Sequence, residues 1–424
     1  MALGHLSTDL IVSIAEQLEF KKDVNALART SRGLYAILNP YLYRNNTHEE
    51  TCSTVWRAVK RSETGTIQRF KDAGVDLSKL KDPQNSTDNL IHALSRRCGY
   101  RLEGRVPDPV GVIRVLTDNG VDINAKNSYG SSALLIAAAR GDTAILMPLI
   151  DCGADVHVLD PFQSTDATML HVAAHGACPV SFIEYLVDTC GLDVHQRDTK
   201  GQNALHRAVR GDAYDVACFL ITRGVDVNAQ DELGFAPVHF LAHRYTHPMD
   251  LPMFKVLVEN GADVNIRNNK GKTPFHLGTK LWRDVEFMEL LLEKGADVKA
   301  VTPDKGFTAM HLAAKVGALD LLPLYVKYGG DINARDARGR TPLHLFVETD
   351  LMDDLEQLTD LGADLDAKDS DGQTFHDLCE QKADRVRRGV DSEGNPLVEE
   401  SSEDDAHVLL HIGLLENLRA AFNP

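Results

Sequence analysis

Histidines are the residues of this sequence whose number and spacing most readily suggest chemistry. The chain has 17 of them. Three pairs have the HxxxH spacing, one helical turn, that two zinc ligands can use: His171/His175, His243/His247 and His407/His411. None of the pairs lies in an HExxH setting, and no third ligand is evident. The pairs therefore predict no metal site, and nothing else in the sequence predicts a cofactor.

Eight histidines instead recur at one position of a repeated motif. They occupy the fourth place of segments such as TMLH, TPFH and TPLH, where we expect the imidazole to bridge backbone groups of adjacent loops. This pattern favours a structural role over a catalytic one. The eight are His92, His171, His206, His239, His276, His311, His344 and His376.

Other signatures of catalysis are missing from the sequence. It contains no GxSxG, GxGxxG or GxxxxGK[ST] motif. Its seven cysteines are odd in number and form no CxxC pair, so we expect reduced thiols in an intracellular protein, cytoplasmic or nuclear. Cys178, Cys190 and Cys218 could approach one another, but buried free thiols are more common than metal ligands. The sequence thus predicts a protein that is not an enzyme.

Charge and hydropathy exclude two classes of partner. The 424 residues carry 45 Lys+Arg against 62 Asp+Glu, a formal charge of −17, so there is no basic surplus to neutralise nucleic-acid phosphates. The longest apolar run, Ala133–Ala139, is too short to cross a bilayer. The first twenty residues contain Asp9 and Glu16 and no cationic start, unlike a signal peptide. We expect neither a nucleic-acid nor a membrane partner.

An internal repeat of about 33 residues organises most of the chain. Its most regular mark is a GVDI or GADV segment that follows a Leu-rich stretch, and the T-x-x-H motif comes about twelve residues later. Such a period is typical of stacked helical units that bury their apolar faces against one another. The segments begin at Gly74, Gly120, Gly153, Gly191, Gly224, Gly261, Gly295, Gly329 and Gly362.

Each part of the repeat predicts a structural element. Thr273-Pro274 and Thr341-Pro342 place a capping hydroxyl before a proline at the first helical position. Leu-rich stretches such as 289–292 then predict a second, antiparallel helix, which a glycine such as Gly295 ends. The Asp-Val-Asn-Ala segment alternates like a short strand, and Asp-x-x-Gly predicts a hairpin turn.

The period and motifs together resemble the ankyrin repeat. The resemblance implies an all-α fold, an ankyrin-repeat solenoid of helix–turn–helix units with hairpin loops, over residues 51–388 in about nine units. Residues 389–405 carry seven acids without Lys or Arg and predict an acidic disordered loop. Residues 406–424 predict a C-terminal capping helix.

Residues 1–46 carry no ankyrin signature and predict three short helices. Leu6-Ser7-Thr8-Asp9, Asp23-Val24 and Ala26-Leu27-Ala28 resemble the F-box, although the Pro usual in its first motif is missing. The resemblance implies binding of the Skp adaptor of a Skp–cullin–F-box ubiquitin ligase. The same helices could instead be a cap over the first ankyrin repeat. Residues implied in adaptor binding are Leu6, Leu10, Ile14, Leu18, Val24 and Leu27.

The sequence therefore favours a substrate-recognition subunit, a monomer outside its complex, whose solenoid binds a target protein. The alternative is an ankyrin scaffold with no ligase role, and an enzyme is the third class. In this fold we expect contacts on the surface made by hairpin tips and first helices, where exposed aromatic and cationic side chains are the best anchors. The candidates are Tyr129, Phe162, Lys200, Phe235, Lys270, Phe307, Arg338 and Arg340.

Overall fold

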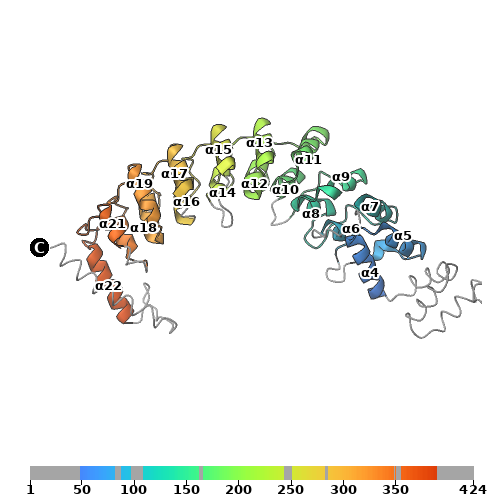
Figure 1. The fold of residues 1–424 in the computed structure, drawn as a ribbon, viewed down its shortest axis with the longest axis horizontal. Helices are drawn as coiled ribbons and strands as arrows, with labels where there is room; N and C mark the ends of the chain where they lie inside the picture. The colour runs from blue at the N-terminus through green and yellow to red at the C-terminus, as the bar shows by residue number, and fades with distance from the viewer. Residues whose placement is uncertain are drawn as a thin grey trace, which may run out of the picture. The chain divides into compact units, whose positions relative to one another are not determined.

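The computed structural model describes pairs of short helices that fall into two compact units, Met1–Arg223 and Gly224–Pro424 (Figure 1). The described residues are 48–81, 87–96, 108–161, 166–242, 251–281, 285–347, 349 and 355–388. The F-box-like unit 1–46, the acidic segment 389–405 and the C-terminal segment 406–424 lie outside them. Those three assignments, and the domain boundaries, stay predictions.

The described residues of the first unit form five helix pairs in chain order. Its helices are α4 (His48–Lys60), α5 (Thr64–Asp72), η2 (Leu77–Lys79), α6 (Leu90–Ser95), α7 (Pro109–Thr117), α8 (Ala133–Ala139), α9 (Thr143–Asp151), α10 (Met169–His175), α11 (Val180–Glu184), η4 (Tyr185–Thr189), α12 (Ala204–Gly211) and α13 (Tyr214–Thr222).

The second unit repeats the same arrangement. Its helices are α14 (Pro237–Leu241), α15 (Leu251–Glu259), α16 (Pro274–Leu281), α17 (Val285–Glu293), α18 (Ala309–Val316), η5 (Leu319–Leu321), α19 (Leu322–Lys327), α20 (Pro342–Phe346), α21 (Leu355–Asp360) and α22 (Phe375–Arg387).

Within each unit the helices form two layers. The first helices of successive pairs contact one another, as α8, α10 and α12 do in the first unit and α16, α18 and α20 do in the second. The second helices make a parallel row, for example α5, α7 and α9. The core lies between the layers and between neighbouring pairs, so each pair buries its apolar face against the next. This arrangement confirms the predicted all-α solenoid.

Local sequence explains where the second helices end. Gly261 has a φ of +88°, a left-handed conformation that costs glycine little and other residues much. The backbone N–H of Gly261 donates to the carbonyl of Val258 (3.0 Å), and that of Ala262 donates to Leu257 (2.9 Å). These bonds satisfy the last carbonyls of α15 and turn the chain away from the helix. The glycine of each GADV segment was predicted in this role.

The predicted strands are wrong. The described residues contain no strand, and their only bridge joins Asp160 to Ala167. In Asp226–Ala229 the carboxylate of Asp226 accepts from the N–H of Asn228 (2.9 Å), and its carbonyl accepts from Ala229 (3.3 Å). Side-chain capping by Asp therefore folds the segment into a turn. Val227 and Ala229 are buried, which produced the alternation that resembles a strand.

One helix pair holds an extra residue. The second helix and its glycine span Val180–Gly191 in this pair but Tyr214–Gly224, one residue shorter, in the next. The chain accommodates the insertion as a π-helical turn, η4, directly after α11. In this turn the N–H of Cys190 donates to the carbonyl of Tyr185 (3.1 Å). A single-turn π-bulge is the usual result of one residue inserted into an α-helix.

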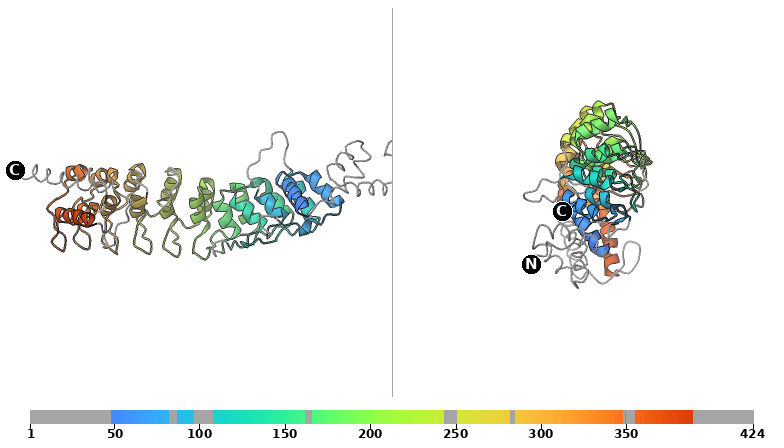
Figure 2. Two further views of the ribbon diagram at one scale, coloured as in Figure 1. Left: turned by 90° about the horizontal axis from the view of Figure 1, so that it is seen from below. Right: turned by 90° about the vertical axis from the view of Figure 1, so that its right-hand side faces the viewer.

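Loops join each second helix to the next first helix, and we call them fingers. In the second unit they are 224–236, 262–273, 296–308, 330–341 and 363–374. They project from the same side of the helix pairs (Figure 2).

Candidate functional site

Neighbouring fingers of the second unit are joined by backbone carbonyls. The N–H of Asn269 donates to Leu233 (3.0 Å), that of Ala337 to Lys305 (3.0 Å) and that of Ser370 to Arg338 (2.9 Å). The guanidinium of Arg267 completes the series by donating to the carbonyl of Val301 (2.9 Å). Because every finger tip from 233 to 370 is bonded to the next, the tips form one preformed surface.

The turn at each tip holds one side chain in solvent. The carboxylate of Asp336 accepts from the backbone N–H groups of Arg338 (2.8 Å) and Arg340 (2.9 Å). Asn268 makes the same pair of bonds to Lys270 and Lys272. The third residue of these turns, Lys270 or Arg338, is exposed. The predicted hairpin turn is thus confirmed as a turn, and it displays the residue at this position.

Four of the predicted contact residues are exposed, as expected. Tyr129 is 62% exposed, in the turn that Asn127 begins. Lys200, Lys270 and Arg338 occupy the third position of their turns and are also exposed. Phe162 lies outside the described residues.

The remaining predicted residues differ from the expectation of free surface anchors. Phe235 is half-buried, and its ring centroid lies 5.4 Å from that of His239. Phe307 is only 5% exposed, because its ring stacks on His311 at 5.7 Å and it packs in a cluster with Leu312 and Leu345. Arg340 donates through Nε to the buried Asp336 (2.9 Å). The expectation that Phe307 is an exposed anchor is wrong.

A pocket of about 260 Å³ lies over Phe307 in the second unit. Three cationic groups lie near the centre of the Phe307 ring: Lys305 at 5.7 Å, Lys315 at 5.8 Å and Arg340 at 5.7 Å. At such distances a ring face attracts cations. The pocket is lined by Asp304, Lys305, Phe307, Lys315, Ala337, Arg338 and Arg340.

Two of the pocket's cations and one exposed apolar residue are not among the predicted contact residues. Lys305 precedes the turn glycine Gly306, so its place in the finger could have suggested it. Lys315 lies in the last turn of α18 and is recognisable only from its neighbours in space. Leu233, at the third position of its turn, is 65% exposed. No signal besides that position marked it.

The repeated histidines make the bridging contacts that we predicted. In seven repeats the ring Nδ1 accepts from the backbone N–H three residues earlier, for example that of Thr341 for His344 (3.1 Å). In six of these rings Nε2 then carries the proton and donates to a carbonyl of the following finger, Gln373 for His344 (3.1 Å). The six are His92, His171, His239, His276, His311 and His344. Each such ring links a helix start to the neighbouring repeat.

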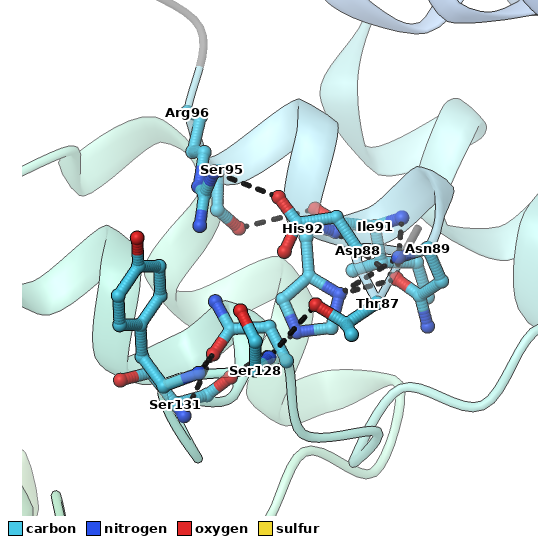
Figure 3. A network of polar contacts seen from close by, with 11 residues as sticks. Thr87, Asp88, Asn89, Ile91, His92, Ser95, Arg96, Ser128 and Ser131 are labelled. Carbon is cyan, nitrogen blue, oxygen red and sulfur yellow. Dashed lines mark hydrogen bonds and ion pairs between the residues drawn. The ribbon is translucent and has the colours of Figure 1, made fainter. Parts of the chain in front are cut away.

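Figure 3 shows this arrangement around His92 in the first unit. Nδ1 of His92 accepts from the N–H of Asn89 (3.1 Å), and Nε2 donates to the carbonyl of Ser131 (3.2 Å). The adjacent carboxylate of Asp88 is buried and pairs with Arg96 (2.8 Å). Because both ring nitrogens are occupied by backbone groups, His92 has no nitrogen left to serve as a general base.

His376 does not follow the other seven, so its predicted role is wrong. In Thr374-Phe375-His376-Asp377 the position three residues after the threonine is held by Asp377, whose carboxylate accepts from the N–H of Thr374 (2.8 Å). His376 is displaced by one residue and its Nε2 lies 3.2 Å from Glu380. Both motifs contain a threonine followed closely by a histidine, so the one-residue difference in spacing is easily overlooked.

Burial controls the protonation of the bridging histidines. It lowers the pKa of His239 and of His276 to about 4, although hydrogen bonds to backbone groups act in the opposite direction. Burial also lowers the pKa of His92, His171 and His311. These rings are neutral at pH 7 because charging them would remove a cation from water.

The described residues offer no built metal or thiol site. No three His, Cys, Asp or Glu side chains of the described ranges gather closely enough to hold a metal ion. Of the HxxxH pairs, His171 uses both ring nitrogens, Nε2 on the carbonyl of Gln202 (3.0 Å). Cys178 is buried and donates to the carbonyl of Ala138, and burial raises the pKa of its thiol to about 12. Such a thiol is a poor nucleophile.

The helices of the described residues were also compared with the requirements for crossing a membrane. None of the helices in this described part of the chain combines the length and the apolar character needed to span a bilayer.

Family comparison agrees with this geometry. The chain matches the family described as ankyrin repeats (3 copies) over residues 107–198, 134–231 and 223–302, and ankyrin repeats (many copies) over 291–346. These matches lie within residues 107–346 and none is to an F-box family, so the F-box resemblance is not confirmed.

Several curated proteins are similar to part of this chain. Neurogenic locus notch homolog protein 2 of Homo sapiens is 33% identical over 217 residues, 51% of this chain and 8% of that protein. Notch homolog protein 1 of Danio rerio is 32% identical over 277 residues, 64% of this chain and 10% of that protein. Alpha-latroinsectotoxin-Lt1a of Latrodectus tredecimguttatus is 28% identical over 162 residues, 38% and 11% respectively. The chain thus spans about a tenth of these relatives.

Proposed function

The chain belongs to the ankyrin-repeat family over residues 107–346, and from this we propose that it acts by binding other proteins and catalyses no reaction. The observation that carries the proposal is the row of bonded finger tips in the second unit. A preformed surface loses little conformational entropy on binding, which favours recognition of a partner. The seven bridging histidines and Cys178 are buried and make structural contacts, which fits a protein without a catalytic centre.

We propose more specifically that the protein is the substrate-recognition subunit of a Skp–cullin–F-box ubiquitin ligase. Residues 1–46 would dock on the Skp adaptor through Leu6, Leu10, Ile14, Leu18, Val24 and Leu27, and the array 51–388 would hold the target. The protein would be an intracellular monomer outside the complex, cytoplasmic or nuclear. The support is the order of motifs in the sequence.

The alternative is an ankyrin scaffold that joins partners without a ligase. The array itself fits both functions, because fingers and first helices would contact a partner in either case. The two functions differ at residues 1–46, which in a scaffold would only cover the end of the array.

Co-purification of the intact chain with the Skp adaptor tests the difference. We expect the wild type to retain the adaptor and the double variant Leu10→Asp/Ile14→Asp to lose it, with unchanged circular dichroism. Leu233→Asp is the matched control, since it places the same charge on an exposed apolar residue of the array and should leave adaptor binding intact. An intact chain that fails to bind the adaptor would reject the ligase proposal in favour of the scaffold.

A further inference from the structure

The pocket over Phe307 is a cationic site on an acidic chain. The protein carries a formal charge of −17, yet the lining of this pocket contains four cations, Lys305, Lys315, Arg338 and Arg340, and one carboxylate, Asp304. Of these, Arg340 is already paired with the buried Asp336 (2.8 Å). The remaining charges leave the pocket locally positive.

Two of the cations are available for a ligand. Lys305 and Arg338 are exposed, and neither forms an ion pair with a carboxylate in the described ranges of the chain. Asp304 does not neutralise them through direct contact. Its carboxylate accepts instead from the Thr302 side chain and from backbone amides, which outweigh the effect of burial and keep its pKa below the usual range.

The backbone that carries the two exposed cations is held in place. Lys305 and Arg338 lie on neighbouring fingers, which the Ala337 N–H to Lys305 carbonyl bond joins at 3.0 Å. The floor below them is equally fixed, because Phe307 donates its N–H to Thr302 (3.1 Å) and stacks on His311. Such preorganisation reduces the entropy lost when an anion binds.

The shape of the pocket favours a carboxylate over a nucleobase. Phe307 is only 5% exposed, so its ring offers no open face on which a base could stack. A long polyanion would also meet the negative charge of the rest of the chain. A short acidic segment would not, because screening limits the reach of charges to about 10 Å at 0.1 M salt. The guanidinium of Arg338 can hold a carboxylate with two parallel hydrogen bonds.

From this geometry we propose that the pocket formed by Lys305, Lys315, Arg338 and Arg340 over Phe307 binds an acidic peptide segment of the partner protein. Carboxylates of the segment contact Arg338 and Lys305, while Arg340 and Phe307 form the rigid floor. The inference deepens the proposed function, on which it rests, by naming the chemistry of the partner.

The test is fluorescence anisotropy with the full-length protein and a labelled ten-residue peptide of alternating glutamate and serine. At 50 mM NaCl we expect Arg338→Glu and Lys305→Gln each to weaken binding roughly tenfold, the loss of one charge-assisted contact. Lys255→Glu is the matched control, because Lys255 is an exposed cation of the same unit that lies on the second helix α15, outside the fingers and the pocket. It should change the affinity less than about twofold.

Three results would overturn the proposal. They are equal binding of a peptide with glutamine in place of glutamate, equal weakening by Lys255→Glu and Arg338→Glu, and stronger Arg338-dependent binding of a ten-nucleotide RNA. The adaptor experiment stays independent of these outcomes, since the pocket substitutions are far from residues 1–46 in the sequence. If the protein binds the adaptor but does not bind the acidic peptide, only the proposal that the pocket binds an acidic segment is rejected.

Discussion

At the scale of single residues, the repeated histidines determine how the repeats join. The hydroxyl of Thr308 and the N–H of the same residue both lie within hydrogen-bond distance of Nδ1 of His311 (2.8 and 3.2 Å), while Nε2 reaches the carbonyl of Arg340 (3.0 Å). A neutral imidazole can accept at one nitrogen and donate at the other, whereas a charged one can only donate. Protonation would therefore break the bond to the helix start.

Stability should consequently fall as the pH is lowered. The pKa of His239 and His276 is about 4 in the folded chain, below the value of about 6.5 in an unfolded one. Between these values the unfolded state binds more protons, so the contribution is complete above about pH 6.5 and is lost as the pH falls towards 4. Each histidine should contribute a slope of about 1.4 kcal/mol per pH unit.

Urea unfolding at several pH values between 4.5 and 7.5 measures this slope. His276→Asn should reduce the pH dependence by the share of one histidine, whatever its effect on the stability itself. Equal slopes for wild type and His276→Asn would contradict the assignment.

At the scale of an element, the second helices differ in how much change of length they tolerate. The pair Val180–Gly191 accepts its additional residue as the turn η4, and Phe182, Ile183 and Leu186 still face the core. The ion pair between Asp188 and Arg223 joins this turn to the end of α13 through two hydrogen bonds of 2.8 and 2.7 Å. The insertion is thus absorbed without loss of apolar burial.

Deletion of one residue should therefore change stability little in one second helix and greatly in the next. Removing Thr189 should convert the π-turn into an α-helix and change the melting temperature by only about 2 °C, since no buried side chain is lost. Removing Thr222 from α13, which has no surplus residue, should rotate the following turn and cost on the order of 3 kcal/mol. Thermal unfolding followed by circular dichroism compares the two. A larger loss for the Thr189 deletion would contradict this reading of η4.

At the scale of the whole molecule, some junctions between repeats carry an additional amide bridge. The side chain of Asn265 accepts from the N–H of Asp297 (2.8 Å) and donates to the carbonyl of Gly295 (2.8 Å). Asn124, Asn228 and Asn333 make the same two bonds to their following repeats. At the equivalent positions 157, 195 and 299 the sequence has His, His and Lys. Because the stability of a repeat array depends on nearest-neighbour terms, we expect the junctions to differ in strength.

Substitution at equivalent positions of adjacent repeats tests this difference. Asn265→Ala should lower the free energy of unfolding by about 1–2 kcal/mol, since it removes the two hydrogen bonds to the Asp297 amide and the Gly295 carbonyl. Lys299→Ala, at the same position of the next repeat, should cost less than about 0.5 kcal/mol. Urea unfolding of both variants provides the comparison. Equal costs would show that the asparagine bridges add nothing to the junctions.

The sequence by itself determined the repeat period, the helix pairs, the glycine at each helix end and the histidine bridge. These features depend on contacts between residues a few positions apart, such as the bond from Thr341 to His344. Because the same residues recur at regular spacing along the chain, the spacing predicts the features. The shifted His376 shows the limit of this reasoning, because one residue of offset moves a ring out of the bridging position.

Only the tertiary structure decided which finger residues are accessible and what they form together. Phe307, Lys315 and Arg340 are separated in sequence, and their gathering depends on how the finger 330–341 lies against α18. The predicted strands were also decided only by the tertiary structure. Alternating burial of Val227 and Ala229 is compatible with a strand and with an Asp-capped turn. The physical reason is that side-chain burial is determined by the neighbouring repeat, about one period away, rather than by the local segment.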